Sequence, residues 1–238
     1  MTKSLITPEQ QEQIKRVSWE KIFATSLLQG CGEGDSDNLR GLFAGYWHFV
    51  DNFPGVIRAT YEASASFSKY GKVLSGALLE METDERNHRT LWIKSADAAS
   101  INEAELYGSA PLPEVQEIIT SMLERASLWQ RLLDFVAVEI VAEGISVYLL
   151  ECERFHARMG KKGIGWFNVH SVHPADQTSH EDIAYRAAQS MMPAGTAAFA
   201  TINQTIQEAV DRFVVAAYAC CERYCAALRP AGKPWVDD

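Results

Sequence analysis

The sequence lacks an apolar run long enough to cross a membrane or to act as a secretion signal. Its longest apolar stretch, Phe135 to Leu150, is interrupted by Glu139 and Glu143, whereas a membrane-spanning helix needs about 20 mostly apolar residues. The N-terminal segment MTKSLITPEQQE contains no apolar core of signal-peptide length. We therefore expect a cytoplasmic protein.

Positive charge is also scarce. Lys and Arg number 22 against 31 Asp and Glu, the formal net charge is −9 at pH 7, and the longest basic run is Lys161-Lys162. Phosphate backbones and anionic membranes are bound through clusters of basic side chains. We therefore expect neither nucleic acid nor a membrane as a partner.

Paired cysteine spacing is missing as well. The five cysteines are an odd number and form no Cys-x-x-Cys pair; they are Cys31, Cys152, Cys220, Cys221 and Cys225. Neither a disulfide framework nor a zinc knot fits this pattern. Buried, reduced thiols are expected.

Hairpin signals are absent, and the apolar residues recur with helical periodicity. The 238 residues, of which 47% are hydrophobic, suffice for one core, so we expect one all-α domain over residues 1–238. Thr7, Pro8 and Gln10 form an expected helix start, and Pro54 should end or bend a helix. The expected helices, about seven or eight, cover residues 8–30, 35–54, 54–70, 73–92, 114–159 with a break near 126–127, 174–192 and 194–228.

One expected helix places a carboxylate and an imidazole on its apolar face. Glu85 and His88 are spaced i, i+3 and continue the apolar stripe of residues 73–92. Glu80 and Glu82 flank that stripe. A kink at residues 83–84 would turn either of them inward instead.

A second stretch carries two carboxylates in apolar surroundings. Glu139 and Glu143 lie one helical turn apart within Val136–Ile145, and a buried carboxylate needs a cation or a proton. We expect Glu139 to bind metal; the alternative is an ion pair with an Arg such as Arg131. For Glu143 we expect a supporting or separate role.

A third stretch combines imidazoles with an acid. His173, Asp176 and His180 are spaced i, i+3, i+7, and at roughly 100° per residue they fall within about 60° of one another on a helix. The structural alternative treats His173 as a helix-start residue before Pro174 and Asp176 as a first-turn acid. That alternative does not account for His180.

The three stretches together supply oxygen and nitrogen ligands without thiolate, a set that suits iron or manganese better than structural zinc. Two divalent cations carry four positive charges, and three carboxylates leave one net positive charge. This balance favours a dinuclear site. The expected ligands are Glu85, His88, Glu139, His173, Asp176 and His180.

The order of these motifs resembles the haem-oxygenase-like diiron oxidases over roughly residues 40–190, including the stretch Phe49-Val-Asp-Asn-Phe-Pro54. This superfamily shares its helical bundle with haem oxygenase and the TenA proteins. Three further residues are less certain metal ligands: Glu80, His170 and Asp51. The resemblance points to His170 because it follows Trp166-Phe167, so that it competes with His173, and to Asp51 because some members carry a further carboxylate near this position.

The resemblance implies a two-iron site (Fe2+/Fe3+) that reacts with O2 through a peroxo-diferric intermediate and oxidises a small organic substrate. We expect an amino acid, possibly a tryptophan-like one converted to a nitrile, as in the nitrile-forming member that acts on a brominated tryptophan. Tyr46, Trp47 and Phe53 are the expected substrate contacts. An external electron donor and a homodimer are possible partners.

Two other functions compete with the oxidase. One is a cofactor-less hydrolase of the TenA kind, in which Cys152 would be the nucleophile. The other is a non-catalytic helical module that binds haem or a partner protein through a single histidine.

Overall fold

The computed structural model describes residues 5–64, 71–171, 179–193 and 198–225, and these residues contain α-helices and no β-strand. The expected all-α fold class is therefore confirmed, but the expected number of about seven or eight helices is too low for the described residues, because the expected helices 8–30 and 114–159 are divided by short breaks. The helices are α1 (Pro8–Phe23), α2 (Ser26–Gly32), α3 (Ser36–Gly45), α4 (Trp47–Ser64), α5 (Gly71–Ala98), α6 (Glu103–Gly108), α7 (Pro113–Leu123), α8 (Leu128–Glu151), α9 (Glu153–Gly163), α10 (Gly165–Ser171), α11 (His180–Met191) and α12 (Ala198–Tyr224).

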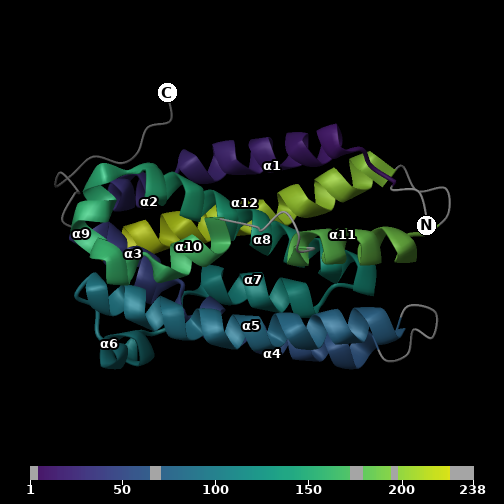
Figure 1. The fold of residues 1–238 in the computed structure, drawn as a ribbon, viewed down its shortest axis with the longest axis horizontal. Helices are drawn as coiled ribbons and strands as arrows, with labels where there is room; N and C mark the ends of the chain where they lie inside the picture. The colour runs from purple at the N-terminus through teal and green to yellow at the C-terminus, as the bar shows by residue number, and fades with distance from the viewer. Residues whose placement is uncertain (1–4, 65–70, 172–178, 194–197, 226–238) are drawn as a thin grey trace.

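Helix α8 is the centre of the bundle. It contacts α1, α10, α11 and α12, while α4 and α5 lie side by side along the long axis on the other side of the molecule from α1 (Figure 1). The middle of α8, from Leu132 to Ala142, is buried without a break. A helix that is apolar on all sides has to be enclosed by its neighbours, so Glu139 is carried into the interior by the helix that bears it.

Several expected boundaries are confirmed. Thr7 caps α1 in a reciprocal capping box with Gln10, and Pro8 is the first helical residue. The break expected near residues 126–127 separates α7 from α8. Helix α5 runs without interruption through residues 83–84, so the kink that would have turned Glu80 inward does not occur.

The first part of the expectation for Pro54 is wrong: no helix ends there, because α4 continues through it. A proline inside a helix costs about 3 kcal/mol, but Phe53 and Ile57 on either side of it are buried, and their packing outweighs this cost. The chain breaks earlier, after Gly45. A Cβ atom at Gly45 would lie 2.4 Å from the Cys220 sulfur of α12, so glycine there permits the close approach of these helices.

The region from residue 172 to residue 178 lies outside the described residues, and the structure resumes at Ser179, the N-cap of α11. The helix expected from residue 174 is therefore described only from His180 onward. His173 and Asp176 fall in the part that is not described. None of the described helices is long and apolar enough to pass through a bilayer.

Candidate metal centre

Five side chains from four helices converge between α5, α8, α10 and α11. Glu85, His88 and His170 form one group whose potential ligand atoms all lie within 4.8 Å of one another, and Glu85, Glu139 and His180 form a second such group. Glu85 belongs to both groups. The structure therefore brings together four of the six expected ligands, with His170 as a fifth residue.

Helix α5 supplies the first pair. The i, i+3 spacing puts Glu85 and His88 on one face of the helix, and His88 Nδ1 lies 3.1 Å from Glu85 Oε1. The side chain of Glu85 is only 13% exposed and that of His88 only 17%. The carboxylate and the imidazole are thus held together away from bulk water.

Helix α8 supplies Glu139, which is 9% exposed. Its Oε1 lies 3.5 Å from Nδ1 of His180, the first residue of α11. On the opposite side of the same imidazole, Nε2 lies 3.3 Å from Asp84 Oδ2. His180 is therefore placed between two carboxylates, one on α8 and one on α5.

The short helix α10 supplies His170, which is buried. Its Nδ1 lies 2.8 Å from the Trp166 carbonyl oxygen one turn earlier, so a proton on Nδ1 is donated to that carbonyl and Nε2 is the nitrogen left as an acceptor. The Trp166 ring lies against His170 at 4.0 Å between centroids, and the His88 ring lies at 4.4 Å. These contacts hold the imidazole at the centre and exclude water from that side.

The partners of the buried carboxylates distinguish this cluster from the rest of the interior. Asp134 pairs with Arg125, Glu82 with Arg58 and Arg86, and Glu143 with Lys15 at 2.5 Å; these ion pairs neutralise the three carboxylates with permanent cations.

Within the described part of the chain, the ion pairs of Glu85 and Glu139 are with histidines alone. A histidine neutralises a carboxylate only while it carries a proton. A metal ion can replace that proton, which is not possible for an arginine or lysine pair. The donor set of carboxylate oxygens and imidazole nitrogens therefore fits iron or manganese.

The same carboxylates perturb the imidazoles. Burial alone would lower the pKa of His180, but the hydrogen bond and charge of Glu139, with Glu85 and Asp84, raise it to about 9. Burial also acts to lower the pKa of His88, and Glu85, Glu139 and Asp84 raise it above its ordinary value. Without metal, both histidines therefore favour the protonated form.

Next to this cluster, Glu181 follows His180 on α11. Its burial raises the pKa to about 7; Lys15 acts against this shift, whereas Glu143 and Glu139 add to it. Three acidic side chains, Glu139, Glu143 and Glu181, therefore lie close together where α8 and α11 meet.

Three other candidate carboxylates lie elsewhere. Glu80 is exposed. Glu82 is buried but bound by two arginines. Asp51 pairs with Arg89 at 2.6 Å and belongs to neither ligand group. Of the carboxylates considered on this helix, the structure places Glu85 in the cluster.

The aromatic residues expected to contact substrate pack within the fold. The Tyr46 hydroxyl donates a hydrogen bond to the Phe213 carbonyl, Trp47 packs edge-on against Tyr107, and Phe53 packs edge-on against Phe135. All three expected residues are buried. Their contacts are explained by core packing, and their role with a substrate stays a prediction.

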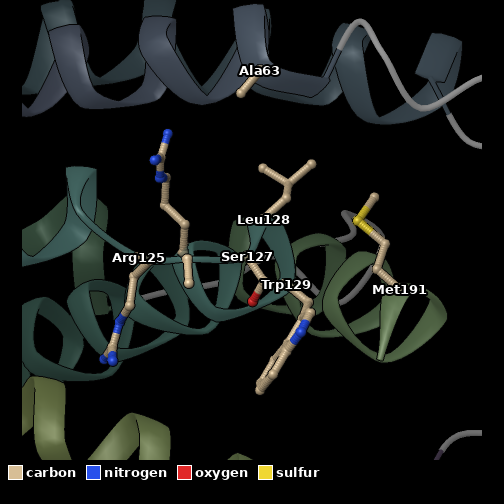
Figure 2. Close-up of a pocket in the computed structure, with 8 residues that line it drawn as sticks. Ala63, Arg125, Ser127, Leu128, Trp129 and Met191 are labelled. Atoms are coloured by element: carbon tan, nitrogen blue, oxygen red, sulfur yellow. The ribbon is translucent and has the colours of Figure 1, made fainter. Parts of the chain in front are cut away.

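A pocket of about 470 Å³ lies at the end of the bundle where α7 turns into α8. Figure 2 shows Ala63 of α4 facing Leu128 at the start of α8, with Met191 of α11 to one side. Both arginines that line it are used by the fold: Arg125 binds Asp134, and Arg131 donates to the last carbonyls of α7. No residue of the cluster lines this pocket.

Cys152, the nucleophile of the hydrolase alternative, lies at the junction of α8 and α9. Its thiol donates to the Tyr148 carbonyl at 3.3 Å, and burial raises its pKa, with Glu33 and Glu151 adding to the effect. Both features oppose formation of the reactive thiolate. The five cysteines are all free, and Cys31, Cys220 and Cys225 are buried as expected.

Comparison with known proteins gives a result for the fold alone. No model of a known protein family matches the sequence, and no curated protein is significantly similar to it.

Solved structures do match. A domain of unknown function with a haem-oxygenase-like fold from Shewanella denitrificans has a TM-score of 0.75 at 13% identity, over 98% of this chain and 100% of that one. A TenA homologue from Pseudomonas syringae pv. tomato gives 0.74 at 14% identity over 90% and 92% of the two chains. One from P. horikoshii gives 0.61 at 13% over 90% and 97%. The chain thus has the all-helical, haem-oxygenase-like fold.

Proposed function

We propose that the chain is an O2-dependent non-haem diiron oxidase that acts on a small organic substrate. The observation that supports this most directly is the pair of ligand groups that share Glu85, in which carboxylates are balanced by imidazoles alone among the described residues. One shared carboxylate between two groups is the arrangement that a dinuclear centre needs. When bound, two iron ions would supply the O2 binding and the electrons for its reduction.

The chain's own residues would hold these ions as follows. Glu85 would contribute to both positions, His88 and His170 to one, and Glu139 and His180 to the other. The hydrogen bond from His170 Nδ1 to the Trp166 carbonyl keeps Nε2 as an acceptor. Before loading, the protons on His88 and His180 neutralise the carboxylates; each ion would displace them.

The walls of the centre are suited to keeping water out. Trp166 packs against both His170 and Trp92, and Trp92 packs in turn against Phe43. Such a dry aromatic wall strengthens the electrostatic interactions inside a site and suppresses side reactions. We propose an amino acid as the substrate, on the resemblance noted from the sequence.

The test is an anaerobic Fe2+ titration followed by elemental analysis. We expect two irons per chain in the wild type, loss of one in His170→Ala, loss of the other in His180→Ala and loss of both in Glu85→Gln. His156→Ala is the matched control, because His156 is exposed and its Nε2 lies at the Leu150 carbonyl away from both groups. If the wild type takes up fewer than two irons, or Glu85→Gln retains both, the proposal is wrong.

An oxygen electrode then tests the reaction class. We expect O2 uptake by the Fe2+ protein to rise with at least one member of a panel of amino acids, and to disappear in Glu85→Gln. Unchanged O2 uptake in that variant would contradict the oxidase.

The TenA homologues among the structural neighbours favour a cofactor-less hydrolase as the second candidate. Under that function, chelation of metal would leave turnover intact and Cys152→Ala would abolish it. If the chain is the oxidase, chelation should abolish turnover and Cys152→Ala should leave it intact. The hydrogen bond of Cys152 and its raised pKa weigh against this residue as the nucleophile of a hydrolase.

A further inference from the structure

Asp84 lies immediately before Glu85 on α5, yet it belongs to neither ligand group. Its Oδ2 atom lies 3.3 Å from Nε2 of His180, reaching from α5 to the first residue of α11. The other nitrogen of this imidazole, Nδ1, lies 3.5 Å from Glu139 Oε1. The two nitrogens of His180 therefore face different carboxylates.

We propose that Asp84 is a positioning residue for the metal centre: it accepts the hydrogen bond from His180 Nε2 and so makes Nδ1 the nitrogen that binds metal beside Glu139. This role rests on the proposed function, since it concerns the same site.

An imidazole can bind a metal through one nitrogen while the other, protonated nitrogen is held by a hydrogen-bond acceptor, and that acceptor selects the tautomer and the ring orientation. On loading, Nδ1 would release its proton as H⁺ and become the nitrogen that holds the ion. Nε2–H would keep facing Asp84.

His170 shows the opposite arrangement. There Nδ1 is held, by the Trp166 carbonyl at 2.8 Å, so Nε2 is the nitrogen available to the cluster. The two histidines would thus bind through different ring nitrogens. Asp84 does for His180 what a backbone carbonyl does for His170, but with a negative charge.

Exposure separates Asp84 from the ligands themselves. Its side chain is 43% exposed, against 21% for His180 and 11% for Glu139. Asp84 acts from this half-exposed edge on the pKa of His180, which it helps to raise together with Glu139 and Glu85. The expected effect of losing such a partner is about 10- to 100-fold in metal affinity.

The experiment is a titration of the metal-free full-length chain with Co2+ alone, comparing wild type with Asp84→Asn and Asp84→Ala. The amide of asparagine can still accept a hydrogen bond but carries no charge. We expect two Co2+ positions in each protein, with affinity at one of them falling about 10-fold in Asp84→Asn and closer to 100-fold in Asp84→Ala. The other position should keep its affinity. Asp97→Asn, an exposed acid on the same helix, is the matched control and should behave as wild type.

A second readout identifies the ligand nitrogen directly. In the Zn2+-loaded protein labelled with ¹⁵N-histidine, we expect the His180 signals, assigned with His180→Gln, to show a proton on Nε2 and metal on Nδ1. Metal on Nε2 would overturn the proposal, because Nε2 would then carry no proton to donate to Asp84.

Two further outcomes would also overturn it. Wild-type affinity at both positions in Asp84→Ala would show that the residue does nothing for the site, and loss of both positions would show a role beyond His180. A wild-type protein that binds no Co2+ would instead contradict the proposed function, and with it this role for Asp84. Circular dichroism establishes that the variants remain folded.

Discussion

The metal-free protein should lose stability as the pH rises above neutrality, because His180 must give up the proton that neutralises Glu139. The pKa of His180 is about 9 in the folded chain, against an ordinary value of 6.5. A pKa that is raised on folding stabilises the folded state fully below the unfolded value, and this contribution disappears as the pH passes through the folded value. The relevant window is therefore pH 6.5 to 9.

The magnitude follows from the same two values. At about 1.4 kcal/mol per pH unit, the difference between 6.5 and about 9 corresponds to roughly 3 kcal/mol of unfolding free energy. His180 is only 21% exposed, so solvent screening removes little of this. Glu181 acts in a lower window: its folded pKa of about 7 exceeds the ordinary 4.5, so its destabilising effect develops between pH 4.5 and 7. Above pH 7, His180 and His88 act in the same direction, because the pKa of each is raised on folding.

Urea unfolding of the metal-free protein at pH 7, 8 and 9 measures the effect, with His180→Gln as the matched control. Wild type should lose most of the 3 kcal/mol over this series, while the variant should change much less. Saturating Fe2+ or Zn2+ should reverse the wild-type trend, because metal binding requires deprotonated imidazoles. Parallel pH dependence in wild type and His180→Gln would refute the assigned role of the His180–Glu139 pair.

Three further predictions concern the surrounding fold. Glu82→Gln should leave the metal stoichiometry unchanged and cost about 1 kcal/mol in urea unfolding, because Glu82 binds Arg58 and Arg86 rather than the cluster; loss of a metal ion would make Glu82 a ligand. Arg125→Met should cost about 3 kcal/mol or more, because it leaves the Asp134 carboxylate buried without its bidentate partner; a change below about 1 kcal/mol would contradict this. Gly144→Ala should lower the unfolding free energy by about 1–3 kcal/mol, since a Cβ there would lie 2.6 Å from the Trp19 ring; thermal unfolding at wild-type temperature would show that Trp19 moves aside freely.

The sequence predicted the helical class and the first half of the cluster because both depend on local spacing. Glu85 and His88 share a helix, so a spacing of three residues is enough to place them on one face. Glu139 was identifiable because its neighbours in the sequence are apolar. Neither inference needs knowledge of how the helices pack.

The remaining features depend on contacts between distant segments. That Glu82 is neutralised by Arg58 of α4 could not be read from its own helix. The Trp166 carbonyl that holds His170 lies one turn earlier on the short helix α10, and this contact exists only once that helix has formed. Within its own segment, Asp84 indicates only a possible kink at residues 83–84. Its contact with His180 arises from the packing of α5 against α11.

Glu85 stands where both ligand groups meet, and the groups draw on α5, α8, α10 and α11. Ions at these positions would therefore act as a cross-link between segments that lie far apart along the chain. Loading should slow amide hydrogen exchange at the start of α11 and in α10 most of all, since His180 and His170 lie there and would be fixed to α5 and α8 through the ions. Bound metal would then stabilise the fold as well as take part in the reaction.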